Sequence, residues 1–136
     1  MTHATAAGRT APIQDSLTQP FWQGAARGEL LLPLSPDTKE ICWPPRRFGP
    51  ADSSNSPKWI KAGGSGIVYT YSVVHRSTHP RPTVPYVLAV VQLDEGVYFT
   101  SNIVEVEPER VFIGMPVTVV FEELPGGGKL PVFRPK

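Results

Sequence analysis

Hydrophobic and polar residues alternate most clearly in the second half of the chain, which predicts β-strands there. Residues 66–75 (GIVYTYSVVH) have the two-residue period of a half-buried strand. Strict alternation assigns Ile67, Tyr69, Tyr71 and Val73 to one face, and Val68, Thr70, Ser72 and Val74 to the other. Residues 86–93 (YVLAVVQL) are apolar on both faces, so this strand is either buried on both or covered on its outer face by another segment or chain.

Further strands and turns complete this half of the chain. Asp94-Glu95-Gly96 predicts a hairpin turn, and extended segments follow at 97–103, 117–123 and 130–134. Residues 108–114 (PERVFIG) predict one helical turn between the third and fourth strands. Five strands with a short helix at that place suit a mainly β fold, the small Greek-key barrel called the OB-fold, over residues 63–136.

One short helix is expected before the strands, within residues 14–28. Thr18 can cap its N-terminus, and Pro20 suits its first turn. Phe21 and Trp22 each stand four residues before an alanine, so the helix has an aromatic face that must pack on something. This helix is one candidate to cover the outer face of the doubly apolar strand.

The rest of the N-terminal half is less regular. Residues 1–13 are small and polar, and we expect a disordered tail. Within residues 29–62, the apolar runs 30–32 and 41–43 can form a short hairpin. Prolines and small polar residues then forbid regular structure until an extended segment resumes at 58–60.

Composition narrows the class of protein. Gly 12 and Pro 16 among 136 residues exclude a fold dominated by long helices. A net charge of +1 gives no electrostatic case for nucleic acid or an anionic membrane as partner. The single cysteine, Cys42, excludes an internal disulfide and a multi-cysteine zinc site. No apolar run is long enough to span a bilayer and no secretory signal is visible, so we expect a soluble cytoplasmic protein.

Several short motifs occur in a distinctive order between residues 17 and 135. They are Pro-Phe-Trp at 20–22, Pro-Pro-Arg at 44–46, Val-Val-His-Arg at 73–76, and Pro-Tyr at 85–86 followed by Leu-Asp-Glu-Gly at 93–96. In this order and spacing the chain resembles the acyl-CoA-associated OB-fold family long known as domain of unknown function thirty-five. That resemblance implies an N-terminal helix, a rubredoxin-like zinc ribbon and a C-terminal OB barrel.

The chain departs from the family at the zinc ligands. Members of the family carry two Cys-x-x-Cys pairs around the Pro-Pro-Arg, and in that register the four positions are Ser35, Thr38, Gly49 and Asp52. A structural zinc needs about four nitrogen or sulfur ligands, which these residues do not supply. We therefore expect residues 29–62 to form a degenerate, metal-free ribbon. A register shift of one or two residues would not alter this, because the chain has one cysteine.

The resemblance also implies a function. Such proteins are accessory subunits of thiolase-fold enzymes (thiolases, lipid-transfer-type thiolases, acyltransferases and retro-aldolases) that act on acyl-CoA thioesters. We therefore expect a non-catalytic subunit of a hetero-oligomer that stabilises its partner and helps to shape the acyl-CoA site. No cofactor of its own is expected, while a coenzyme A thioester would be the substrate of the complex.

Two other classes of function remain open. A single-stranded nucleic-acid OB module could use Tyr69, Tyr71 and Phe99 as stacking platforms, although the charge and the absence of a basic stripe on these strands speak against it. A stand-alone enzyme is disfavoured because the sequence shows no catalytic constellation and no nucleophile elbow.

The strongest site candidate is the basic, proline-rich stretch at 75–82 (HRSTHPRP). Its side chains His75, Arg76, His79 and Arg81 follow the end of a long predicted strand. Arginine forks bind phosphate in a bidentate manner, so this loop could contact coenzyme A; docking of a partner protein is the favoured interpretation. Arg46 and Arg47 form a second basic spot, although Arg46 could instead hydrogen-bond carbonyls of its own loop.

Aromatic residues outside the barrel need a separate explanation. Phe21, Trp22, Trp43 and Trp59 lie on the helix and on the two arms of the ribbon. They could form a satellite core, together with Phe48, that organises this half in place of zinc. Alternatively, some of them form the partner interface, where tryptophan is a frequent anchor.

Overall fold

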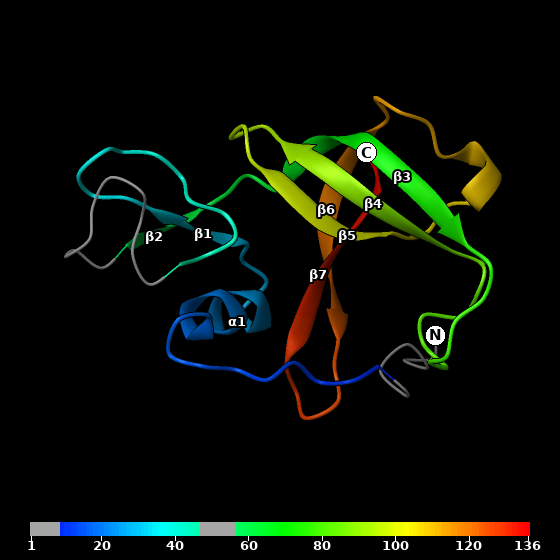
Figure 1. Ribbon diagram of the computed structural model, residues 1–136, viewed down its shortest axis with the longest axis horizontal. Coiled ribbons are helices and arrows are strands. Elements are labelled where there is room, and N and C mark those ends of the chain that lie inside the picture. The colour runs from blue at the N-terminus through cyan, green and yellow to red at the C-terminus, as the bar shows by residue number, and fades with distance from the viewer. Residues whose placement is uncertain (1–8, 47–56) are drawn as a thin grey trace.

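The computed structural model describes residues 9–46 and 57–136. Figure 1 shows a barrel and, beside it, a small two-stranded ribbon with one helix below it. In chain order the elements are α1 (Gln19–Ala26), β1 (Leu31–Leu34), β2 (Lys58–Lys61), β3 (Ser65–Val74), β4 (Tyr86–Leu93), β5 (Tyr98–Ile103), the 3-10 helix η2 (Pro108–Arg110), β6 (Pro116–Glu123) and β7 (Lys129–Pro135).

The barrel is closed and has the strand order β3-β4-β5-β7-β6. Closure comes from β6 pairing antiparallel with the start of β3, where Ser65 lies opposite Thr118. β5 and β7 meet in parallel at Ile103 and Phe133. Five strands with a short helix between the third and fourth confirm the mainly β, OB-fold prediction.

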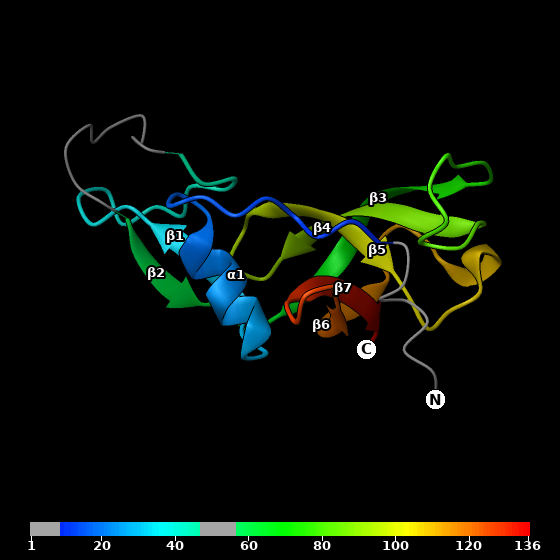
Figure 2. The same ribbon diagram turned by 90° about the horizontal axis from the view of Figure 1, so that it is seen from below.

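The interior of the barrel is filled by alternate residues of each strand. In β4 the inner face is fully buried and consists of Val87, Ala89, Val91 and Leu93. On its outer face Leu88 is 44% exposed. Helix α1 packs against β1 and β7 instead, and Figure 2 shows it between the ribbon and β7. Of the two coverings considered for this face, α1 is therefore not the one formed, and cover by another chain stays a prediction.

A β-bulge in β3 changes which side chains face inward. Val68 pairs with Val91 and Thr70 with Val90, which leaves Tyr69 as the extra residue. Because one residue is inserted, the alternation shifts phase: Val68 is buried, and Tyr71 packs against the same core. The predicted common face of Ile67, Tyr69, Tyr71 and Val73 is therefore wrong, since Ile67 and Tyr69 are 39% and 51% exposed.

Helix α1 begins close to the predicted place but is capped differently. Thr18 occupies the N-cap position without a side-chain cap bond. Instead, the Asp15 carboxylate accepts bonds from the N–H of Thr18 at 2.8 Å and from its hydroxyl at 3.0 Å, and these bonds lower the pKa of Asp15. Gly24 lets the helix approach β1 closely, because a Cβ there would lie 2.6 Å from Leu31. No helix among the described residues is long and apolar enough to cross a membrane.

The ribbon contains a longer pairing than the expected hairpin, of which only a short part forms. β1 pairs with β2 along its whole length, from Leu31 opposite Lys61 to Leu34 opposite Lys58. The segment around residue 41 contributes one isolated bridge, between Leu34 and Ile41. Residues 58–60 are extended as predicted, and they supply the main partner strand of the ribbon.

A chain of aromatic rings joins the helix and ribbon to the barrel. The ring of Phe21 lies 4.9 Å from that of Trp22 and 5.1 Å from that of Trp43. Trp43 in turn stacks on Phe99 of β5 at 5.0 Å, and Phe99 contacts Phe133 of β7 at 5.9 Å. The described residues therefore include three members of the satellite aromatic core that the sequence suggested, Phe21, Trp22 and Trp43, and this group is continuous with the barrel core. Trp59 packs against the same core, and Phe48 lies outside the described residues.

We expect Phe21→Ala to lower the free energy of unfolding by about 3 kcal/mol, because Phe21 is 6% exposed and lies between two other rings. Urea unfolding followed by circular dichroism measures this change. Phe112→Ala is the matched control: Phe112 is 55% exposed, and its loss should change stability by about 0.5 kcal/mol or less. Equal effects of the two substitutions would contradict the role of the aromatic chain.

Candidate functional site

The loop between β3 and β4 lies at the end of the barrel away from the ribbon (Figure 1). His75 and Arg76 follow β3 and are exposed. Further along, the backbone N–H of His79 donates to Ser77 Oγ at 3.1 Å, and Arg81 Nη1 donates to Thr83 Oγ1 at 2.7 Å. The loop thus holds its own polar groups in local turns beside the barrel.

Arg9, a residue that the sequence did not single out, reaches this loop from the N-terminal segment. Its guanidinium forms an ion pair with Glu122 of β6, and the two side chains are only 12% and 13% exposed. Nη2 of Arg9 also donates to Asn102 Oδ1 of β5 at 3.2 Å. Asn102 itself is fixed by a bond from Nδ2 to the carbonyl oxygen of Val87 in β4, at 3.0 Å. Arg9 is therefore anchored to β5 and β6.

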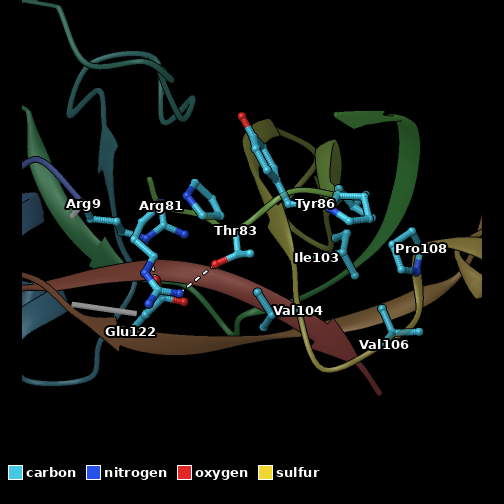
Figure 3. Close-up of a pocket in the computed structure, with 12 residues that line it drawn as sticks. Arg9, Arg81, Thr83, Tyr86, Ile103, Val104, Val106, Pro108 and Glu122 are labelled. Atoms are coloured by element: carbon cyan, nitrogen blue, oxygen red, sulfur yellow. Dashed lines mark hydrogen bonds and ion pairs between the residues drawn. The ribbon is translucent and has the colours of Figure 1, made fainter. Parts of the chain in front are cut away.

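Beside Arg9 and Arg81 lies a pocket of about 240 Å³, which we call the first pocket (Figure 3). Its polar end is formed by Arg9, Arg81, Thr83 and Glu122. Its opposite end is apolar and consists of Ile103, Val104, Val106 and Pro108, which come from the end of β5, the segment after it and the first residue of η2. The pocket is therefore polarised from basic to apolar.

A second pocket, of about 250 Å³, shares Arg9 and Arg81 with the first. His79 adds a further basic side chain, while Trp22, Leu124 and Leu130 supply apolar surface. No aspartate or glutamate is among the described residues that line this second pocket. The two arginines thus stand between two adjoining pockets.

The structure divides the predicted basic residues into separate groups. His79 and Arg81 come together at the pockets. His75 and Arg76 precede them in the loop and line neither pocket. Arg46 is exposed and belongs to the ribbon half of the chain, and Arg47 lies outside the described residues. No local sequence pattern marks Arg9, because only tertiary packing brings this N-terminal arginine to Glu122.

The aromatic residues proposed for a partner interface are largely occupied within the chain. Phe21 is almost fully buried. Trp22, Trp43 and Trp59 are half-buried and pack against the core, so each offers only part of its surface to a partner.

More exposed apolar surface lies on and near the bulged strand. Tyr69 of β3 contacts Tyr98 of β5, with ring centroids 4.8 Å apart. Phe112 and Ile113, 55% and 68% exposed, precede Gly114, whose N–H bonds to the carbonyl of Val68. We call Ile67, Tyr69, Tyr98, Phe112 and Ile113 the apolar patch. Strict alternation places Ile67 and Tyr69 on one face but joins them to Tyr71 and Val73, which pack against the core.

The stacking platform proposed for single-stranded nucleic acid is not formed. Tyr69 points outward, whereas Tyr71 packs against the core and Phe99 is 5% exposed within the aromatic chain. The three rings therefore do not share an exposed face, and the nucleic-acid interpretation loses its proposed contact surface.

Two of the four expected metal-ligand positions can be placed, and both form a local turn. Ser35 Oγ accepts the N–H of Thr38 at 3.2 Å, and the N–H of Ser35 bonds to the Glu40 carbonyl at 2.8 Å. Gly49 and Asp52 lie outside the described residues. Within residues 9–46 and 57–136, no three His, Cys, Asp or Glu side chains gather as a metal site would require.

Comparison with known proteins places the chain in a class. Residues 59–122 match the family model described as "ChsH2, C-terminal OB-fold domain". A chain of the solved structure described as "Ltp2-ChsH2(DUF35) aldolase" superposes with a TM-score of 0.86 and 33% identity, covering 92% of this chain and 98% of that one. The protein therefore belongs to the DUF35 family of OB-fold proteins.

Two curated relatives are similar to large parts of this chain. The "Probable enoyl-CoA hydratase alpha subunit" of Thermomonospora curvata is 36% identical over 116 residues, which are 85% of this chain and 36% of that protein. A "DUF35 domain-containing scaffold protein" of Methanocaldococcus jannaschii is 46% identical over 70 residues, 51% of this chain and 50% of the relative. The chain thus spans about a third to a half of the length of these relatives.

We expect the purified chain to contain no stoichiometric zinc, because Ser35, Thr38, Gly49 and Asp52 occupy the family's ligand positions. A chelator should accordingly leave the thermal midpoint unchanged, since no metal contributes to the folding free energy. Elemental analysis and thermal unfolding with and without chelator measure both. About one zinc per chain, retained after gentle chelation, would overturn this prediction.

Proposed function

We propose that this protein is a non-catalytic accessory subunit that binds and stabilises a thiolase-fold partner acting on acyl-CoA thioesters. The observation that carries the proposal is the similarity over 98% of a chain from the structure described as "Ltp2-ChsH2(DUF35) aldolase". Relatives named as a hydratase alpha subunit and as a scaffold protein support the same interpretation. The acyl-CoA substrate and the thiolase fold of the partner are parts of the proposal.

The chemistry of the two pockets supports a non-catalytic role. Their described lining contains no cysteine or serine that could act as a nucleophile. Glu122, the one carboxylate among the described residues that line the first pocket, is engaged in an ion pair with Arg9. A partner subunit would supply the reacting groups.

The apolar patch supports association with another protein. Its five side chains are each between 39% and 68% exposed, and two of them are tyrosines in contact. Apolar groups gathered on one surface of a small domain are a frequent mark of an interface. In this proposal the patch and the exposed pair His75 and Arg76 face the partner, while His79 and Arg81 remain at the pockets.

We expect coexpression with a thiolase-fold protein of the same host to yield a stable hetero-oligomer. Size-exclusion chromatography with light scattering measures its mass, and the chain alone should show no turnover of acyl-CoA esters. A monodisperse monomer with no affinity for any such protein of its host would contradict the proposal.

Single substitutions separate docking from ligand contact. If Arg76 docks the partner, Arg76→Ala should weaken subunit association and leave the KM of the assembled complex unchanged. If Arg81 contacts acyl-CoA, Arg81→Ala should raise KM about tenfold or more and leave association unchanged, since a charge-assisted hydrogen bond contributes about 1.5–3 kcal/mol. Arg134→Ala is the matched control, because Arg134 is an exposed arginine of β7 outside the loop. If neither loop variant changes either quantity, the loop has neither role.

A further inference from the structure

The first pocket combines features that suit a ligand of one chemical kind. Two guanidinium groups, from Arg9 and Arg81, and one carboxylate, from Glu122, are among the described residues that line the polar end, and these three groups together carry a net positive charge. Thr83 adds a hydroxyl beside Arg81. A single anionic group bound there would balance the charge of this end.

Arg9 is held in place before any ligand arrives. It is 12% exposed, and its described bonds to Glu122 and Asn102 use Nε and one N–H of Nη2. A guanidinium has five N–H donors in a rigid fork, so these two bonds leave donors for an anion. Because Glu122 competes for the same guanidinium, it should weaken the binding of an anion to Arg9.

The opposite end of the pocket excludes a second charge. Ile103 is 4% exposed, and Val104, Val106 and Pro108 complete an apolar wall (Figure 3). The volume of about 240 Å³ lies below the range of roughly 300–1,000 Å³ that is typical for drug-sized ligands. The pocket therefore suits a compact apolar body, such as a short acyl chain or a single ring.

We propose that the first pocket binds a compact amphiphilic anion, with its head at Arg9 and Arg81 and its apolar body against Ile103, Val104 and Val106. The head is the carboxylate of a free acid, because arginine recognises its two anionic oxygens and because a coenzyme A ester, whose phosphates lie far from its acyl chain, is too large for a pocket of about 240 Å³. This inference does not depend on the proposed function, since every residue of the site belongs to this chain.

Isothermal titration of the full chain with three probes tests the proposal. Octanoate offers a carboxylate head, coenzyme A offers phosphates, and octanol offers the apolar chain without a charge. We expect octanoate to bind, more weakly at high salt, and octanol to bind at least tenfold more weakly than octanoate. Coenzyme A, which has phosphates but no matching apolar chain beside them, should bind more weakly than octanoate. No binding of octanoate at millimolar concentration, or tighter binding of coenzyme A, overturns the site.

Two substitutions with opposite expected effects on anion affinity show whether binding occurs in this pocket. Arg81→Gln should weaken binding of the anion at least tenfold, whereas Glu122→Gln should strengthen it because Arg9 loses its competing carboxylate. Arg134→Gln, in an exposed arginine of β7, should leave affinity unchanged. Binding that all three variants leave intact would place the anion elsewhere and overturn the assignment.

A last variant keeps the test valid if the Glu122 substitution disturbs folding. Arg81→Lys retains the charge but loses the fork, so the affinity should fall between those of the original chain and Arg81→Gln. Thermal midpoints of all variants are measured in parallel. Should the partner complex form normally while no anion binds to the chain, this inference fails and the proposed accessory role stands.

Discussion

The run of aromatic contacts from Phe21 through Trp43 and Phe99 to Phe133 is the interaction on which the arrangement of this protein depends. It links a helix, a ribbon arm and two barrel strands that are far apart in the sequence. Edge-to-face and stacked rings contribute beyond the area that they bury, so a few of them can position a ribbon that is too small to have a core of its own. At the other side of the junction, Glu95 of the β4–β5 turn accepts the N–H of Gly63 at 2.9 Å, which fixes the connection between β2 and β3.

The strands and the barrel could be predicted from the sequence because alternation and turn residues are local signals. Which residues of β3 face inward could not be predicted, because the bulge at Tyr69 depends on how β3 pairs with β4. The pairing of β1 with β2 could not be predicted for a related reason: residues 41–43 are nearer in sequence and do form one bridge, but β2 offers a longer ladder. In each case a long-range pairing overrode a local pattern.

The candidate site shows the same limit. His79 and Arg81 were found because they lie in one short, unusual stretch of sequence. Arg9 was missed because nothing next to it in the sequence marks it, and its partner Glu122 is far along the chain. Clusters of like residues are visible in a sequence, whereas an ion pair between distant segments becomes visible only when the fold is known.

The bulge in β3 also separates the outward side chains of the strand from the register of its inward side chains, which a regular strand would couple. If Tyr69 were removed, Val68 would still lie opposite Val91 and Thr70 opposite Val90, and Tyr71 would continue to face the interior in ordinary alternation. The packing inside the barrel thus does not depend on Tyr69, while the outer surface gains an aromatic side chain from it. A single residue inserted into such a strand therefore changes the side chains on the outer surface of the barrel and leaves the packing of its interior unchanged. The outer surface of this fold can diverge in sequence while the packing of its core is preserved.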